Sequence, residues 1–338
     1  MRDVLIDFNC CKETYKQQDA GFTYNPSFKT FEAPETTTTT TTTGQSLISN
    51  LLLNSSDKRL SIEICPGRNL DLSLLPGMDL NFFSITWHGA SAERLKSAVQ
   101  LASRLKCQGY HVLLHLAGRN LRRDEALKVL KQFKAVGVRN IFALQGDPSQ
   151  VVERDDTKCC FSYAADLVRF IKLHFGDYFG IAVAGYPDRH PQSVNLEQDI
   201  HFLKHKISCG ADFIITQASY DYGSFTSFYK VCKSSGIHLP IVPGVFVISS
   251  YKSLIGISKI CSVTVPADIL SIVSKNKHNA ETVREFGIHQ ATELIKSILS
   301  DREHCFKGVH IFSLNDLGLV KTVVERLGLF KPRLEYPL

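Results

Sequence analysis

The apolar positions of this chain alternate between two patterns from about residue 60 onward. Short apolar or β-branched runs have the length and composition of buried strands, and they lie at 60–65, 80–87, 111–116, 139–144, 181–185, 212–216, 240–245 and 309–313. Between them lie segments with helical periodicity, among them 92–107, 124–136, 163–175, 196–208, 224–234 and 281–299. Strands joined by helices predict a parallel sheet, because each helix returns the chain to the same edge.

Eight strand-and-helix units in about 280 residues fit a closed α/β barrel better than an open sheet. No Gly-x-Gly-x-x-Gly follows the first strand, so the fingerprint of a Rossmann fold is missing. We therefore predict a single (β/α)8 TIM-barrel domain over residues 58–338.

Residues 1–57 have a different composition. They include eight consecutive threonines at 36–43, beside Pro34 and Gly44. Such a stretch buries too little apolar surface to offset the entropy of ordering it. We predict a disordered, low-complexity N-terminal extension that is dispensable for chemistry, with a short helix at 46–53 leading into the barrel.

Composition excludes several classes of protein. The 338 residues, 44% of them hydrophobic, can bury a large core, and the net charge of +6 is too diluted to indicate a nucleic-acid partner. The ten cysteines show neither Cys-x-x-Cys nor Cys/His zinc spacing, so we predict no metal. No signal peptide and no apolar run of ~20 residues is present, which predicts a cytoplasmic protein without membrane contact.

In a barrel the carboxyl ends of all the strands meet on one face, so polar residues there are candidates for function. After the fourth run comes the turn Gln145-Gly146-Asp147-Pro148. Its glycine permits close approach of the backbone, its aspartate supplies a carboxylate, and its proline ends the strand. The remaining strand ends contribute Glu63, Thr86, His115, Tyr186, Gln217, Pro243-Gly244, Phe312 and Asn315.

Glu63 is the most unusual of these residues, because it interrupts an apolar strand. Burial should raise the pKa of its carboxyl, as a general acid requires, although a buried Lys or Arg partner would also explain it. His115 is either a functional residue or a hydrogen-bonded core histidine. Tyr186 offers a flat stacking surface, and Gln217 a fixed amide that could bind the edge of a heterocycle.

Four longer motifs add a resemblance to a known family. They are RNIFALQGDP at 139–148; FGDYF at 175–179 with VAGYP at 183–187 and His190-Pro191; GADFIITQ at 210–217; and PIVPG at 240–244. In this order and spacing they resemble the methylenetetrahydrofolate reductase family over residues 60 to 328. The resemblance covers the catalytic barrel, without the regulatory domain that animal members carry after it.

The resemblance implies an FAD-dependent barrel that passes a hydride from NAD(P)H to 5,10-methylenetetrahydrofolate, giving 5-methyltetrahydrofolate. Glu63 matches the general acid that helps open the bridging ring to an iminium, and Asp147 the carboxylate near the flavin and the pterin. The positions that match FAD contacts are Thr86, Trp87, His115, Gln145, Gly146, Asp147, Tyr163, Ala164, Tyr186, His190, Asp199 and Lys206. The positions that match folate contacts are Gln217, Phe312 and Asp316. Barrel flavoproteins often self-associate, so a homo-oligomer is an open expectation, and the choice between NADH and NADPH stays open.

Two substitutions depart from the family pattern. Gln145 stands where the family has Arg, which predicts weaker FAD retention or an altered flavin potential. Asp316 stands where the family has a folate-contacting Arg and inverts the charge there. Arg119 follows the third strand, but its neighbours Ala117 and Gly118 differ from the usual pattern.

These departures leave three functions open. The first is a working flavin-dependent reductase. The second is a non-catalytic relative that binds flavin or folate, or that partners a full-length reductase. The third is a barrel flavoenzyme with another substrate, such as an amino acid imine.

Overall fold

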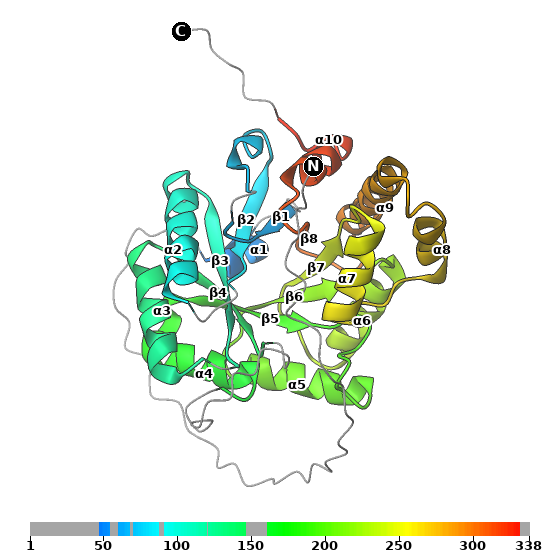
Figure 1. The fold of residues 1–338 in the computed structure, drawn as a ribbon. Coiled ribbons are helices and arrows are strands. Elements are labelled where there is room, and N and C mark those ends of the chain that lie inside the picture. The colour runs from blue at the N-terminus through cyan, green and yellow to red at the C-terminus, as the bar shows by residue number, and fades with distance from the viewer. Residues whose placement is uncertain are drawn as a thin grey trace, which may run out of the picture. The chain divides into compact units, whose positions relative to one another are not determined.

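The computed structural model describes residues 47–54, 60–67, 70–87, 91–119, 121–146 and 161–331, which belong to one compact unit, Gln45–Leu338. Its parallel strands close into a barrel in chain order (Figure 1). They are β1 (Leu60–Ile64), β2 (Leu80–Ile85), β3 (His111–Ala117), β4 (Asn140–Leu144), β5 (Gly180–Gly185), β6 (Phe213–Ala218), β7 (Ile241–Phe246) and β8 (Val309–Phe312). β1 pairs with both β2 and β8, which closes the ring. The predicted (β/α)8 barrel is confirmed.

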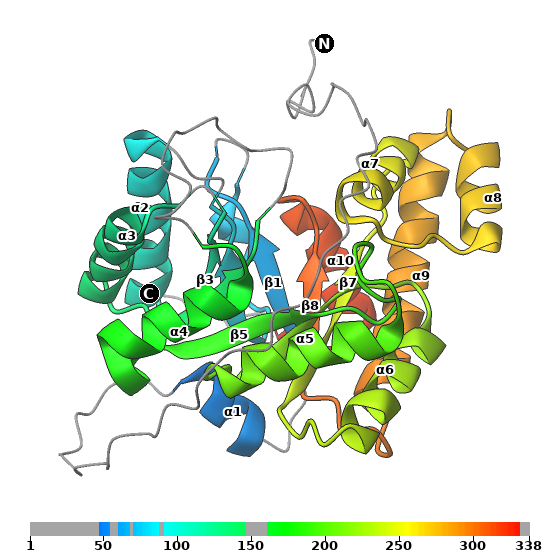
Figure 2. The ribbon, with the colours of Figure 1, turned by 90° about the horizontal axis from the view of Figure 1, so that it is seen from below.

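Helices surround the barrel (Figures 1 and 2). They are α2 (Ala92–Cys107), α3 (Arg123–Ala135), α4 (Ala164–Phe175), α5 (Leu196–Ser208), α6 (Tyr222–Ser234), α7 (Tyr251–Cys261), α8 (Ala267–Lys275), α9 (Ala280–Ser300) and α10 (Leu317–Arg326), with short 3-10 turns η2 (Leu72–Leu74) and η5 (Gly176–Tyr178). The periodicity did not single out α7, α8 or α10, which are short. Side-chain caps begin α7 and α10, where Ser250 Oγ and Asp316 Oδ1 accept backbone N–H groups. No helix of the described residues is both long and apolar enough to span a membrane.

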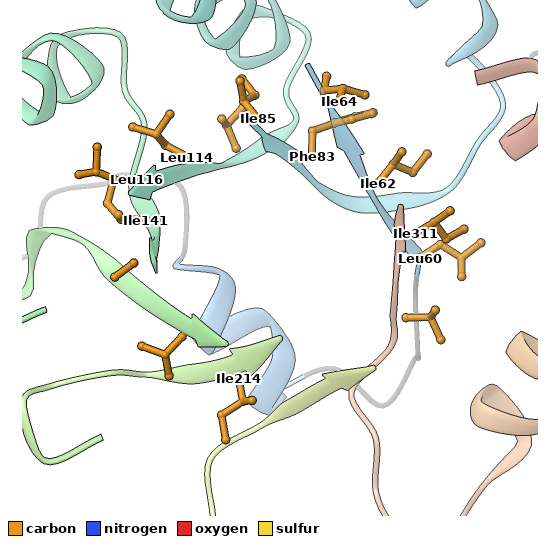
Figure 3. Close-up of a cluster of buried hydrophobic side chains, with 14 of the residues drawn as sticks. Leu60, Ile62, Ile64, Phe83, Ile85, Leu114, Leu116, Ile141, Ile214 and Ile311 are labelled. Carbon is orange, nitrogen blue, oxygen red and sulfur yellow. The ribbon is translucent and has the colours of Figure 1, made fainter. Parts of the chain in front are cut away.

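Alternation along the strands divides the core into two layers. The residues of the outer layer point from the strands toward the helices (Figure 3), as Ile62, Phe83, Leu114 and Ile141 do. The inner layer fills the barrel with Phe82, Leu113, Phe142, Phe213, Ile215 and Val242. Burial of each large apolar side chain contributes about 1.5–3 kcal/mol. The barrel interior is therefore packed, and ligands are restricted to its rim.

The helix α1 (Ile48–Asn54) closes the end of the barrel at which the strands begin. Its Ile48 and Leu52 join the inner layer, and the backbone N–H of Ile48 donates to Oδ1 of Asn140, the first residue of β4, at 2.9 Å. The short helix predicted at 46–53 is thus observed, and it packs with the barrel. Residues 1–46 and 55–57 of the predicted extension lie outside the described residues, and their assignment stays a prediction.

Candidate active site

Glu63 and His115 face each other at the carboxyl ends of β1 and β3. His115 Nδ1 lies 3.7 Å from Glu63 Oε2, and the Glu63 side chain is only 19% exposed. Burial raises the pKa of the Glu63 carboxyl from 4.5 to about 7. No Lys or Arg pairs with Glu63 in the part of the chain that the structure describes. The carboxyl therefore carries a proton for much of the time near neutral pH, as expected for a general acid.

His115 is both a core residue and a member of this site. It is buried, and its ring lies edge-on to Phe142 with the centroids 4.9 Å apart. The packing holds the imidazole in place while Nδ1 points toward Glu63. The two interpretations of His115 from the sequence are therefore compatible.

Backbone contacts hold the end of β1 in position. The side chain of Asn315 accepts from the N–H of Cys65 at 2.7 Å and donates to the carbonyl of Cys65 at 2.8 Å. Thr86 directly follows β2; its N–H donates to the carbonyl of Ile64 at 2.9 Å, and its Oγ1 donates to the same oxygen at 3.3 Å. These bonds restrict the backbone that follows Glu63, which limits the directions that its carboxyl can take.

A buried polar group inside the barrel was not identified from the sequence. His310 of β8 is fully buried, with Nδ1 2.8 Å from Ser61 Oγ and Nε2 3.0 Å from Ser84 Oγ. Burial lowers the pKa of His310 to about 3, so the ring is neutral. A histidine at an inward position of an apolar strand was the available signal, but its partners come from β1 and β2, far away in sequence.

The end of β4 packs closely against the end of β3. The N–H of Arg119 donates to the carbonyl of Gln145 at 2.7 Å, and Gln145 Nε2 donates to the carbonyl of Ser162 at 3.0 Å. Gly146 has φ +94°, and a Cβ there would lie 3.1 Å from the Cβ atoms of both Ala117 and Arg119. Glycine is thus required by the approach of these two strand ends. Asp147 and Pro148 lie outside the described residues.

Three more of the predicted flavin contacts lie near these strand ends. Tyr163 and Ala164 stand at the start of α4, and Tyr163 is exposed. Trp87 follows β2 and is partly buried. Its Nε1 is shielded from solvent and has no hydrogen-bond partner among the described residues. A shielded donor of this kind is available to a ligand.

The structure brings together four predicted contacts, of which Tyr186 and His190 follow β5 and Asp199 and Lys206 belong to α5. Lys206 Nζ donates to the carbonyl of Ala184 at 2.5 Å, and burial lowers the pKa of this amine to about 8. Asp199 accepts from the backbone N–H of His190 at 3.1 Å. Tyr186 lies edge-on to His190, with the ring centroids 4.5 Å apart, and burial raises the pKa of its hydroxyl. An aromatic face, a cation and a carboxylate therefore occupy one place at the rim.

Gln217 and Phe312 reach the same rim from β6 and β8. A shallow pocket contains both Gln217 and Tyr186, and Gln217 Oε1 accepts from the N–H of Ala218 at 2.9 Å. A Cβ on Gly244 would lie 2.6 Å from the ring of Phe312, so Gly244 makes room for this ring. The small pocket is thus lined by the amide of Gln217 and the ring of Tyr186, while Phe312 is not among its lining residues.

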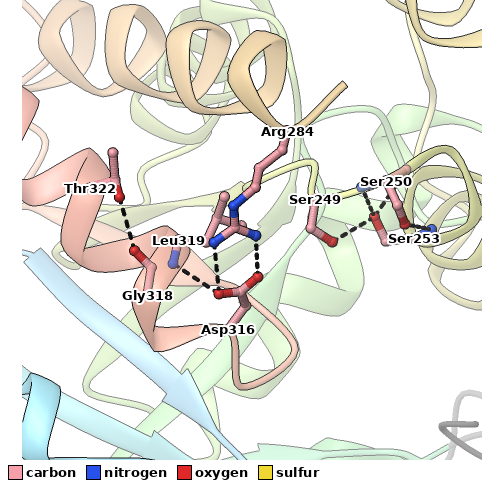
Figure 4. Close-up of polar contacts among 8 residues, drawn as sticks. All are labelled: Ser249, Ser250, Ser253, Arg284, Asp316, Gly318, Leu319 and Thr322. Carbon is pink, nitrogen blue, oxygen red and sulfur yellow. Dashed lines mark hydrogen bonds and ion pairs between the residues drawn. The ribbon is translucent and has the colours of Figure 1, made fainter. Parts of the chain in front are cut away.

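Asp316 has a different environment from the one expected for a substrate contact. Its carboxylate accepts hydrogen bonds from Arg284 Nη1 at 2.5 Å and Nη2 at 3.1 Å, and from the backbone N–H of Leu319 at 2.9 Å (Figure 4). Burial alone would raise the pKa of Asp316, but the hydrogen bonds from Arg284 and Leu319 hold it below its usual value. Asp316 thus caps α10 and joins it to α9, and its negative charge is balanced within the protein.

Fold and site together define a class: a (β/α)8 barrel in which a buried acid faces a histidine at the carboxyl ends of the strands, with aromatic and cationic side chains at the same rim. The model of a family described as methylenetetrahydrofolate reductase matches residues 72–328. The chain belongs to this family. Glu63 lies nine residues before the matched range.

Sequence relatives carry the same family name. "Methylenetetrahydrofolate reductase (NADH) 1" of Arabidopsis thaliana is 35% identical over 261 residues, which cover 73% of this chain and 43% of the relative. The probable NADPH enzyme of Caenorhabditis elegans is 32% identical over 255 residues, covering 74% and 38%. The 5,10-methylenetetrahydrofolate reductase of Pectobacterium carotovorum is 31% identical over 277 residues, covering 80% and 90%. The chain therefore spans less than half the length of the plant and nematode relatives.

A solved structure supports the fold. An uncharacterized protein from Clostridium thermocellum, described as binding two copies of 5-methyl-5,6,7,8-tetrahydrofolic acid, superposes with a TM-score of 0.59. It is 14% identical and covers 84% of this chain and 99% of its own. At this identity the likeness establishes the barrel only.

Proposed function

We propose that this chain catalyses the FAD-dependent reduction of 5,10-methylenetetrahydrofolate to 5-methyltetrahydrofolate with NAD(P)H, in the cytoplasm. One observation carries the proposal: Glu63, in a chain of this family, is a buried carboxyl with a pKa of about 7, 3.7 Å from His115 at the barrel rim. A protonated carboxyl at neutral pH is what opening of the bridging ring requires, since the departing nitrogen must gain a proton.

The described residues fit FAD. A flavin needs flat contacts and donors, and the diphosphate needs cations. Trp87 Nε1 is a shielded donor without a partner among the described residues, and Tyr186 and Lys206 add a ring and a cation at the rim. We assign cofactor contacts to Thr86, Trp87, His115, Gln145, Gly146, Tyr163, Ala164, Tyr186, His190, Asp199 and Lys206. When bound, FAD supplies hydride transfer between NAD(P)H and the folate.

The chain's own residues carry the proton chemistry and the positioning. Glu63 holds a proton and donates it to the nitrogen that leaves the bridging carbon. His115 and the hydrogen bonds around Cys65 keep the carboxyl at the rim. Gln217 and Phe312 offer an amide and a ring to the pterin. Asp147, outside the described residues, is proposed as the carboxylate near the flavin and the pterin.

Two observations favour the working enzyme over the non-catalytic alternative. Arg284 neutralises Asp316, so this substitution does not leave an uncompensated negative charge facing an anionic folate. Gln145 holds Ser162 through its amide, which gives the substituted residue a structural role next to the site.

Three absorbance measurements test the proposal in order. Purified protein should show a flavin spectrum, NADH or NADPH should bleach it under anaerobic conditions, and methylenetetrahydrofolate should restore it. A colourless chain that cannot be reconstituted with FAD would support the non-catalytic alternative. Bleaching without restoration by the folate would favour a flavoenzyme with another substrate.

A further inference from the structure

Arg119 lies where β3 ends, against the end of β4. Its backbone N–H donates to the carbonyl of Gln145, and its Cβ would lie 3.1 Å from a Cβ at position 146, so Arg119 packs directly against Gly146. The neighbouring Gly118 packs against Phe161, since a Cβ on Gly118 would lie 2.8 Å from Phe161 Cβ. The backbone of Arg119 is therefore held between β4 and the segment that enters α4.

One nitrogen of the Arg119 guanidinium, Nε, is buried in this packed place. This nitrogen is shielded from solvent, yet it has no hydrogen-bond partner among the described residues. The nearby amide of Gln145 does not serve it, because Gln145 donates to the carbonyl of Ser162. A shielded donor on a permanent cation is costly unless an acceptor satisfies it, and an oxyanion is the acceptor that also matches the charge of Arg119.

We propose that Arg119 binds an oxygen of the diphosphate of the dinucleotide cofactor. This inference rests on the proposed function, because FAD is the dinucleotide assigned to the site. A guanidinium suits this partner, because its planar fork matches the oxygens of a phosphate with charge-assisted hydrogen bonds.

The barrel order favours the diphosphate over the carboxylates of a folate tail. Arg119 stands at the ends of β3 and β4, beside the proposed flavin contacts His115, Gln145 and Gly146. The proposed folate contacts Gln217 and Phe312 belong to β6 and β8, and each of these strands stands three strands from β3 in the closed ring. Arg119 is therefore on the cofactor side of the rim.

Titration calorimetry on apoprotein tests this with FAD, riboflavin and inorganic pyrophosphate as probes. Loss of charge-assisted hydrogen bonds should weaken FAD and pyrophosphate binding by about 10- to 100-fold in Arg119→Gln. Riboflavin, which lacks phosphate, should bind as in the wild type. Arg119→Lys retains the charge without the planar fork and should give a smaller loss. The control is Arg122→Gln, which removes an exposed guanidinium three residues away that pairs with Asp124.

The outcomes separate this inference from the proposed function. Unchanged FAD and pyrophosphate binding in Arg119→Gln, with the melting temperature retained, would overturn the role of Arg119. An equal loss of riboflavin binding would also overturn it, because the residue would then serve the ring or the fold. If the wild type binds no flavin, the proposed function fails, and the pyrophosphate comparison between wild type and Arg119→Gln still decides whether this is an oxyanion site.

Discussion

Replacement of Glu63 by Gln should stabilise the folded protein, and more at alkaline than at acidic pH. Burial raises the pKa of the carboxyl from 4.5 to about 7, a difference of about 2.5 units, or about 3 kcal/mol at 1.36 kcal/mol per unit. The folded state holds this proton more tightly than the unfolded state. The contribution of protonated Glu63 to the stability of the folded state is therefore fully present below pH 4.5, and it is lost as the pH rises through 7. Gln cannot ionise, so the variant does not lose this stability at high pH.

The expected gain for Glu63→Gln is below about 1 kcal/mol at pH 5 and approaches about 3 kcal/mol at pH 8.5, a shift of several degrees in melting temperature. Thermal unfolding of wild type and variant across this range, with urea titrations at both ends, measures it. The control is Glu93→Gln, which changes an exposed carboxylate in the first turn of α2. A gain that is equal at both pH values, or larger at pH 5, would refute the assignment of Glu63 as a carboxyl held protonated by burial.

Three further predictions use other features of the site. In rapid-mixing experiments Glu63→Gln should slow reoxidation of the reduced flavin by methylenetetrahydrofolate by about 10²- to 10⁴-fold, with reduction by NAD(P)H nearly unchanged; equal losses in both steps would contradict a role as acid toward the folate. Asp316→Arg should lower the free energy of unfolding by about 2 kcal/mol in urea titrations, since it removes a helix cap and places two guanidinium groups together. Asp316→Asn keeps a cap and should cost about half as much, while tighter folate binding by Asp316→Arg would show that this position faces the substrate after all. Gly146→Ala should destabilise the chain by about 1–3 kcal/mol, because it combines φ +94° with a 3.1 Å contact; an unchanged melting temperature would show that the ends of β3 and β4 can separate.

Much of the barrel could be predicted from local patterns. Eight apolar runs separated by helical segments leave few arrangements, because a helix between two strands requires them to be parallel. Glu63 could be singled out for a similar reason, since a carboxylate in an apolar strand conflicts with the hydrophobic environment around it. The short helices α7, α8 and α10 were not singled out, because their periodicity extends over only nine to eleven residues.

The partners of the site residues could not be predicted in the same way. Asp316 was expected to face the substrate, but Arg284, 32 residues earlier in the chain, takes its carboxylate. His310 and Ser61 are 249 residues apart and meet because β8 pairs with β1. Such contacts depend on closure of the barrel and on side-chain directions, neither of which is encoded in any short window of sequence.

The sequence by itself therefore determined the barrel, the face on which chemistry is proposed and the residues that stand at the ends of the strands. Hydrophobic periodicity, and the burial that it predicts, can be read from a local segment without knowing which other segments pack against it. Only the tertiary structure decided the raised pKa of Glu63, the neutralisation of Asp316 and the position of Arg119 Nε, which no described residue satisfies. Each of these depends on which groups desolvate or pair with a side chain across the closed barrel, and electrostatic free energies are set by such neighbours.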